Sequence, residues 1–268
     1  MNPLLAAWLT GLLAVATLML FTWMLSLVKR DTSIIDIVWG PAFALAAWVY
    51  HLFAPDPIQA RQWLLLILVT VWGLRLGGYI WIRSIGKGED SRYAAMRADH
   101  AESWAWRSLV TVFALQGALV AAIGLPHLMV QAQMVSPGWR WTDALGLGIW
   151  LIGFVFEAGA DWQMLRFKRD PANKGRVMDR GFWAVSRHPN YFGDAMVWWG
   201  MWVIALGAPH GVWTLPSVVL MTFFLLKVSG VALLEKTIVE RRPAYRDYIE
   251  RTPAFFPWFP KKRAEGGS

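Results

Sequence analysis

Long apolar stretches separated by short polar connections run through the whole sequence. A helix that spans a membrane needs about 20 mostly apolar residues, and seven stretches come close to this length. They lack the alternation of apolar and polar positions that marks the strands of a membrane β-barrel. We therefore predict an all-α, polytopic membrane protein with seven transmembrane helices in a single domain, residues 1–268. The predicted spans are residues 4–28, 34–54, 62–82, 108–132, 143–160, 191–208 and 212–234.

The composition agrees with a membrane protein. Hydrophobic residues make up 56% of the chain and charged residues 16%, whereas a soluble domain carries about 25% charge. The first apolar run, which starts at Pro3, is too long for a signal peptide and is expected to be a spanning helix. The chain has no cysteine, which excludes disulfides, zinc–thiolate sites, iron–sulfur clusters and a catalytic thiol.

Basic residues gather in alternate connections between the spans. The connections 29–33, 83–107 and 161–190 hold two, five and seven of them, and the tail from Lys236 holds eight. Such segments normally face the cytoplasm, so we predict an N-terminus outside and a C-terminus in the cytoplasm. The net charge of +8 then reflects topology, and we expect no nucleic-acid partner.

Four ionisable residues lie inside or at the edge of the predicted spans: Asp36, Arg75, Glu157 and Lys227. Ionisable groups at membrane depth are costly and are usually functional. The alternative is that they pair with one another and orient the helices. Glu157 precedes Asp161 by four residues, which places both on one face of a helix.

Polar and basic residues are crowded between the fifth and sixth spans, in the stretch DRGFWAVSRHPNYFGD from Asp179 to Asp194. Arginine and lysine can bind phosphate groups, and Pro189 suits the first turn of a helix. The tail after the last span repeats this composition, and its Tyr245 and Tyr248 are three residues apart, on one helical face. The aromatic and proline run after Thr252 is typical of an interfacial anchor. Motifs such as GxGxxG, the P-loop, HExxH and GxSxG are absent, and we predict no metal site.

The sequence RHPNYFGD before a span, followed by E…YRDYI…P, resembles the membrane steroid 5α-reductases, especially their bacterial relatives. The likeness covers about residues 145–260. Sterol reductases and isoprenylcysteine carboxyl methyltransferases share this architecture, and Asn190 and Asp194 are the positions that favour the reductases.

The resemblance implies that NADPH reduces a carbon–carbon double bond conjugated to a ketone, with the cofactor held in 143–260 and the substrate in 1–132. Asn190 and Asp194 would hold the nicotinamide carboxamide, and the basic residues the phosphates. The residues that the resemblance assigns to the cofactor are Asp161, Arg166, Lys168, Arg176, Arg180, His188, Asn190, Tyr191, Asp194, Glu235, Arg241, Tyr245 and Tyr248.

On the substrate side the family uses a carboxylic acid and a tyrosine to hold the ketone. Asp36 can be the acid, and burial would favour its protonated form. Trp72 lies nearest to the tyrosine position, with Tyr79 two turns further on and Arg75 between them as an intramembrane cation. We therefore expect Asp36, Trp72 and Arg75 to be the catalytic residues.

The expected partners are a steroid-like or other lipid enone and the membrane lipid, and we expect a monomer in the bacterial inner membrane with its cofactor site facing the cytoplasm. Two alternatives stay open. One is a membrane methyltransferase that uses S-adenosylmethionine, because it shares the RHPxYxG pattern. The other is a non-catalytic membrane protein that binds lipid.

Overall fold

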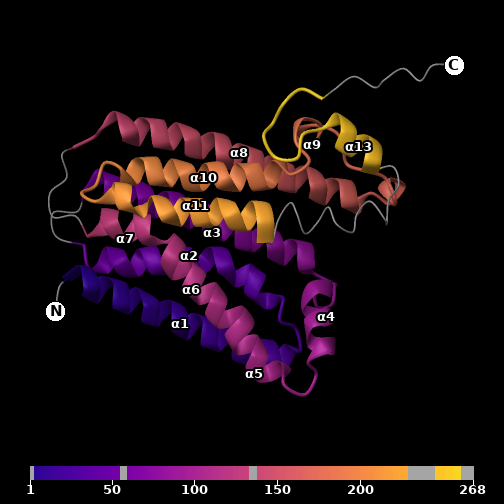
Figure 1. Cartoon of the computed structure of the whole chain (residues 1–268), viewed down its shortest axis with the longest axis horizontal. Helices are drawn as coiled ribbons and strands as arrows, with labels where there is room; N and C mark the ends of the chain where they lie inside the picture. Colours follow the sequence, from indigo (N-terminus) through magenta and orange to yellow (C-terminus); the bar gives the residue numbers. More distant parts are fainter. Residues whose placement is uncertain (1–2, 55–58, 133–137, 229–244, 261–268) are drawn as a thin grey trace. The chain divides into compact units, whose positions relative to one another are not determined.

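The computed structural model describes residues 3–54, 59–132, 138–228 and 245–260 (Figure 1). These residues form helices and connections without a β-strand, which confirms the all-α class. Glu235 and Arg241, and the end of the seventh predicted span, lie outside the described residues. The helices are α1 (Pro3–Lys29), α2 (Ile34–Leu52), α3 (Ala60–Ser84), α4 (Ser91–Asp99), α5 (Trp104–Ser108), η1 (Leu109–Ala114), α6 (Leu115–Ile123), α7 (Leu125–Gln131), α8 (Trp141–Arg169), η2 (Pro171–Asn173), α9 (Phe182–Val185), α10 (Pro189–Ala205), η3 (Gly211–Thr214), α11 (Leu215–Phe223), η4 (Phe224–Val228) and α13 (Tyr245–Arg251).

Five helical segments of the described chain are long and apolar enough to cross a membrane. They are α1, α2, α3, α8 and the segment Trp104–Ile123. The prediction of an integral membrane protein with several spans is consistent with these helices. α10 has 17 residues, and the last apolar helix is described over Gly211–Lys227, so neither reaches the length of the other five within the described residues. The count of seven spans and the orientation of the termini therefore stay predictions.

The fourth predicted span, residues 108–132, is wrong as a single helix. A π-helical turn, η1, joins α5 to α6, and α6 ends where Gly124 precedes α7. Pro126 lies in the first turn of α7. A proline has no N–H to donate, and its ring collides with the preceding turn, so a continuous helix is interrupted there.

The fifth predicted span ends too early. α8 continues past residue 160 through the basic residues to Arg169, because leucine, methionine, arginine and lysine are all good helix formers. It stops before Asp170, which precedes Pro171 and therefore disfavours helical backbone. The carboxylate of Asp170 accepts a hydrogen bond from the backbone N–H of Ala172, 2.9 Å away, and caps η2.

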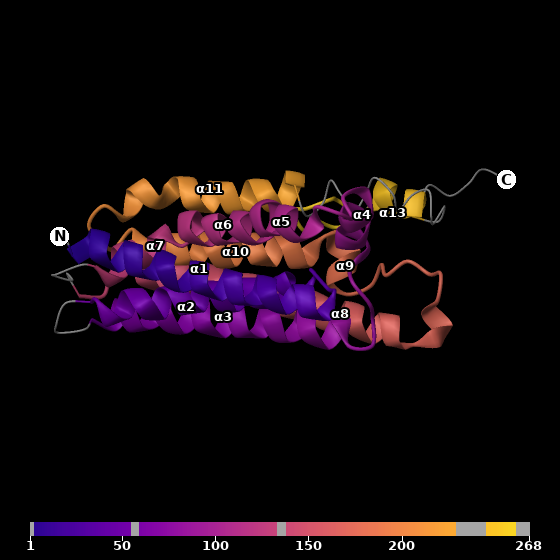
Figure 2. The same ribbon diagram turned by 90° about the horizontal axis from the view of Figure 1, so that it is seen from below.

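The described chain divides into two compact units. The first contains residues 1–143 and 202–217, and the second contains residues 144–201 and 218–268. In the first unit α1 packs on α2, and α2 packs on α3 (Figures 1 and 2). In the second unit α8 lies along α10 (Figure 1).

Glycines let the main helices of each unit approach backbone to backbone. A Cβ atom on Gly40 of α2 would lie 2.6 Å from the carbonyl oxygen of Gly73 in α3. In the second unit a Cβ atom on Gly153 of α8 would lie 2.6 Å from the carbonyl oxygen of Gly193 in α10. Small residues at such contacts are typical of helices that associate in membranes, where close packing provides much of the attraction.

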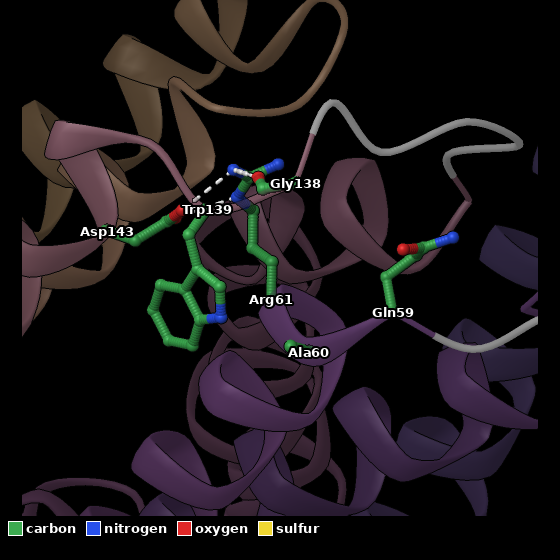
Figure 3. A pocket seen from close by; sticks show the side chains of 6 residues that line it. All are labelled: Gln59, Ala60, Arg61, Gly138, Trp139 and Asp143. Carbon is green, nitrogen blue, oxygen red and sulfur yellow. Dashed lines mark hydrogen bonds and ion pairs between the residues drawn. The ribbon is translucent and has the colours of Figure 1, made fainter.

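A buried ion pair joins α3 to the start of α8 within the first unit (Figure 3). Arg61 donates from Nε and Nη2 to the two carboxylate oxygens of Asp143, both at 2.7 Å. The same guanidinium donates to the carbonyl oxygens of Gly207 and Gly138, at 3.0 and 2.8 Å. Arg61 and Asp143 are 2% and 0% exposed, so neither charge has water to replace its partner.

The ion pair lines a cavity of about 40 Å³ (Figure 3). This volume is far below the roughly 300–1,000 Å³ of a typical ligand site, so we assign the cluster a structural role. Arg61 precedes the third predicted span in the sequence, and the structure makes it the centre of a buried site in which it donates to Asp143, Gly207 and Gly138.

We predict that Asp143→Asn destabilises the protein strongly, because it leaves the buried Arg61 guanidinium without its counter-charge. Breaking a buried pair costs about 3–5 kcal/mol, whereas removing both charges costs less. Thermal unfolding in detergent should therefore show a large drop for Asp143→Asn and a smaller one for the double variant Arg61→Met/Asp143→Leu. Equal melting of wild type and Asp143→Asn would contradict this role.

Candidate functional site

Asp36 lies in the first turn of α2 and contacts two residues of α4 in the first unit. The Tyr93 hydroxyl donates to Asp36 Oδ1 at 2.8 Å, and Arg92 Nη2 donates to Asp36 Oδ2 at 2.9 Å. Tyr93 is buried, whereas Arg92 is exposed. Both contacts use Asp36 as an acceptor, and the Tyr93 hydroxyl directs its single proton to Asp36 Oδ1.

A second set of hydrogen bonds fixes α4 against the turn before α2. Arg97 donates from Nε and Nη2 to the two Glu89 oxygens, at 2.9 and 2.8 Å. Glu89 also accepts from the backbone N–H of Thr32 at 2.7 Å, and the Thr32 hydroxyl accepts from the Trp104 indole N–H at 3.2 Å. We call Thr32, Glu89, Arg97 and Trp104 the α4 tether, because together they hold Tyr93 beside Asp36.

Burial and the neighbouring Asp36 carboxylate raise the pKa of Tyr93, so its hydroxyl keeps its proton at neutral pH. For Glu89, burial favours the neutral acid. The hydrogen bonds from Arg97 and Thr32 outweigh this effect and hold the pKa of Glu89 below its ordinary value. The α4 tether therefore contains a carboxylate at neutral pH.

The other two residues predicted on the substrate side lie in α3. Trp72 is fully buried, and its ring meets Phe43 of α2 edge to face at 5.8 Å. Arg75 is half-buried. Trp39, one turn after Asp36, packs on Phe43 at 5.0 Å, and its indole N–H is buried without a hydrogen-bond partner among the described residues. Asp36 is thus followed along α2 by the aromatic side chains of Trp39 and Phe43, which pack on each other.

The second unit contains a polar pair between α8 and α10. Asn190 Nδ2 donates to Asp161 Oδ1 at 3.2 Å. Asn190 Oδ1 is buried and accepts no hydrogen bond from the described residues. Glu157 and Asp161 are both buried on α8, and Asp194 is buried on α10, one turn after Asn190. The structure therefore brings Asp161 and Asn190 together and leaves one amide oxygen available as an acceptor.

The residues just before the HPNY sequence are held in place by the C-terminal segment. The rings of His188 and Tyr191 stack at 5.8 Å, and Tyr245 and Tyr248 of α13 meet at 5.3 Å. The Tyr248 hydroxyl donates to the carbonyl oxygens of Trp183 and Ser186. This confirms that the two tyrosines lie on one helical face, and it gives the Tyr248 hydroxyl partners in the backbone.

The basic residues assigned to the cofactor phosphates are exposed wherever the structure describes them. Arg166 lies over the Trp162 ring, with its guanidinium carbon 4.9 Å from the ring centre. The others are spread over the end of α8 and the connection that follows it, at Lys168, Arg176 and Arg180. The described residues contain no group of three or more His, Asp or Glu side chains that could hold a metal ion.

A family model with the description "Protein of unknown function (DUF1295)" matches residues 22–252. The chain belongs to the DUF1295 family. An uncharacterized protein of Schizosaccharomyces pombe, C594.04c, is 26% identical to this DUF1295 protein over 271 residues. The match covers 88% of this chain and 75% of the yeast protein. No solved structure matches the chain.

Tyr93 and Arg92 of this DUF1295 protein were missed in the sequence as partners of Asp36. They lie in a connection that the sequence pattern assigned to topology because of its basic residues. Asp90 was the available signal, since an aspartate before SRYAAMR is a good helix N-cap. Its carboxylate indeed accepts from the backbone N–H of Arg92 at 3.0 Å.

We predict that acid weakens the α4 tether. Because the folded-state pKa of Glu89 lies below its ordinary value of 4.5, its carboxylate stabilises the fold at neutral pH, and this stabilisation is lost as the pH falls below that value. Glu89→Gln should melt below the wild type at pH 7, and the gap should shrink as the pH approaches 3. The control Asp99→Asn changes an exposed residue of α4 and should melt like the wild type. A gap that does not depend on pH would refute this role of Glu89.

Proposed function

We propose that this DUF1295 protein is a membrane reductase that uses NADPH to reduce the carbon–carbon double bond of an α,β-unsaturated ketone. The substrate class is a 3-oxo-4-ene steroid or a similarly flat lipid enone. The observation that carries the proposal is the 2.8 Å hydrogen bond from the Tyr93 hydroxyl to Asp36, at the start of an apolar helix. The resemblance of residues 145–260 to the steroid 5α-reductases supports the same reaction.

Tyr93 is the group that we propose to bind the ketone oxygen. Its hydroxyl keeps its proton at neutral pH, because burial and Asp36 raise its pKa. As negative charge develops on the ketone oxygen, the Tyr93 proton would turn from Asp36 to that oxygen and stabilise the charge. Asp36 orients the hydroxyl, and Arg92 holds Asp36 from the other side. Protonated Asp36, the form expected from the sequence, would then donate to the Tyr93 oxygen, so that Tyr93 is the donor to the ketone and Asp36 a positioning residue.

NADPH fits the polar pair of the second unit. Asn190 Oδ1 is a buried acceptor without a partner among the described residues, and a nicotinamide carboxamide offers the N–H groups that such an acceptor needs. Asp194, one turn further on, adds a second acceptor. The phosphates would be held by Arg166, Lys168, Arg176 and Arg180, which are exposed. When bound, NADPH supplies the hydride that joins the β-carbon of the enone, and a proton from water completes the α-carbon.

For the topology we propose all seven spans, with α10 and the last apolar run crossing the membrane in addition to the five longer segments. The basic connections would then face the cytoplasm, with the N-terminus outside. This orientation exposes the proposed phosphate-binding residues to the compartment that contains NADPH. The bacterial inner membrane is the location that we propose.

The decisive assay follows NADPH oxidation by purified protein with progesterone, and identifies the product by mass. We predict oxidation that depends on the steroid, with a product two hydrogens heavier. Tyr93→Phe should lower turnover by at least about a hundredfold, the usual contribution of a positioned proton donor, while NADPH affinity stays unchanged.

Tyr79→Phe is the matched control, because Tyr79 of α3 is the competing tyrosine. It should keep most of the activity. Loss of activity in Tyr79→Phe but not in Tyr93→Phe would refute the role of Tyr93. A wild-type protein that binds S-adenosylmethionine and not NADPH would refute the reductase and support the methyltransferase. Binding of neither cofactor would support a lipid-binding protein.

We predict that Asn190→Leu weakens NADPH binding about two- to tenfold, the value of one net hydrogen bond of 0.5–1.5 kcal/mol. The leucine side chain is similar in size but cannot accept from the carboxamide. Isothermal titration calorimetry in detergent would measure the affinity. Asn173→Leu changes an asparagine in the short helix η2 and serves as the control, with unchanged affinity expected. Equal affinities for wild type and Asn190→Leu would remove Asn190 from the site.

A further inference from the structure

Three large aromatic side chains near the end of the described chain point away from its core. Phe256, Trp258 and Phe259 are 74%, 72% and 81% exposed, whereas Phe255 between them and α13 is buried. We call these three residues the aromatic patch. Full burial of one such ring in an apolar phase is worth about 1.5–3 kcal/mol, so their exposure to water would be unfavourable.

Hydrogen bonds between residues 185–187 and the chain at and before the aromatic patch fix its position. The backbone N–H of Trp258 donates to the carbonyl oxygen of Val185, and the Ser186 hydroxyl donates to that of Phe255, both at 2.9 Å. The Arg187 guanidinium donates to the carbonyl oxygen of Thr252 at 2.6 Å. The patch therefore has a defined position in the second unit and is not a loose tail.

Prolines keep the patch from folding into a helix or pairing as a strand. Pro257 and Pro260 alternate with the aromatic residues in FFPWFP, and each removes a backbone donor and fixes its own φ angle. Such a segment presents rings outward on a stiff backbone. It suits insertion into an apolar layer better than the formation of a packed core.

The contacts of α9, to which the aromatic patch is bonded, show where along α8 the patch lies. The Trp183 indole N–H donates to the carbonyl oxygen of Ala160 at 3.0 Å, and Trp183 belongs to the same short helix, α9, as Val185. Ala160 lies where α8 changes from apolar to basic residues, just before Trp162 and Arg166. The exposed Trp162 ring, with Arg166 stacked on it, is typical of the membrane–water interface, where aromatic rings and basic groups meet.

Basic residues next to the aromatic patch favour a lipid surface as its partner. The sequence continues from the patch with Lys261, Lys262 and Arg263. A basic residue near an anionic membrane surface contributes about 1 kcal/mol of attraction. Aromatic rings are stable in the membrane interface, and basic residues beside them are attracted to acidic headgroups. Together they favour a bilayer that contains acidic lipids.

We propose that the aromatic patch inserts into the interface of the membrane, with its adjoining basic residues on acidic phospholipid headgroups. Through its hydrogen bonds the inserted patch fixes residues 185–187, which lead directly into His188 and Asn190. Contact with the lipid surface thereby helps to fix the position of the Asp161–Asn190 pair in the second unit. This interaction does not depend on which reaction the protein catalyses.

The test uses the absence of cysteine from the chain, since a single introduced cysteine carries a spin label at one known position. Phe259→Cys places the label on the patch, and Glu250→Cys places it on the exposed side of α13 as the control. Each labelled full-length protein is reconstituted in nanodiscs of phosphatidylcholine, with or without phosphatidylglycerol. Power saturation then compares collisions with oxygen, which concentrates in lipid, and with a water-soluble nickel chelate.

We expect the ratio of oxygen to nickel collisions to be several-fold higher at position 259 than at position 250 in discs that contain phosphatidylglycerol. The ratio at 259 should fall when phosphatidylglycerol is omitted or when Lys261, Lys262 and Arg263 are all changed to glutamine. Nickel access at 259 equal to that at 250 would overturn the proposal and leave the patch free for a protein partner. A ratio that ignores both the lipid and the charges would overturn the role of acidic headgroups. Phe256→Cys gives a second label position, should Phe259→Cys not yield folded protein.

Discussion

The cost of burying an unpaired polar group in apolar surroundings governs where the charges of this chain lie. Arg61 and Asp143 are buried together, and the guanidinium reaches two backbone carbonyl oxygens besides the carboxylate. Asp36 enters α2 with both of its oxygens occupied by donors from α4. Among the exceptions in the described residues are the amide oxygen of Asn190 and the indole N–H groups of Trp39 and Trp150.

The helical segments could be predicted from the sequence, because an apolar run of sufficient length has few other stable forms in a membrane. Their ends could not be predicted as well. Hydrophobicity ignores Pro126, which breaks the fourth run, and it undervalues the helix-forming arginines and lysines that extend α8 to Arg169. Pro189 did mark the start of α10, because a proline at that position acts through its own backbone and not through distant contacts.

The candidate site was less accessible to sequence reasoning. Asp36 was found because a carboxylate beside an apolar run is conspicuous, but its partners lie more than fifty residues away, in a connection that reads as ordinary polar sequence. The spacing of Tyr245 and Tyr248 predicted their shared face. It carried no information on the Tyr248 hydroxyl, because the carbonyl oxygens of Trp183 and Ser186 approach it only after the chain has folded. Local sequence patterns thus identify side chains that could take part in binding or catalysis. The tertiary contacts, which the sequence does not show, determine which of them lie close together.

The glycine contact between α2 and α3 limits where an apolar molecule can enter the protein from the bilayer. Where Gly40 faces Gly73, main chain touches main chain, and no side chain separates the two helices. The space between the two backbones at this contact is too narrow for a flat hydrocarbon molecule. A molecule that diffuses laterally in the bilayer therefore cannot pass between α2 and α3 at this point. The molecule that we propose to bind near Asp36 would have to arrive from another flank of α2. A Cβ atom at position 40 would meet the Gly73 carbonyl oxygen at 2.6 Å, so a larger side chain there would push the two helices apart.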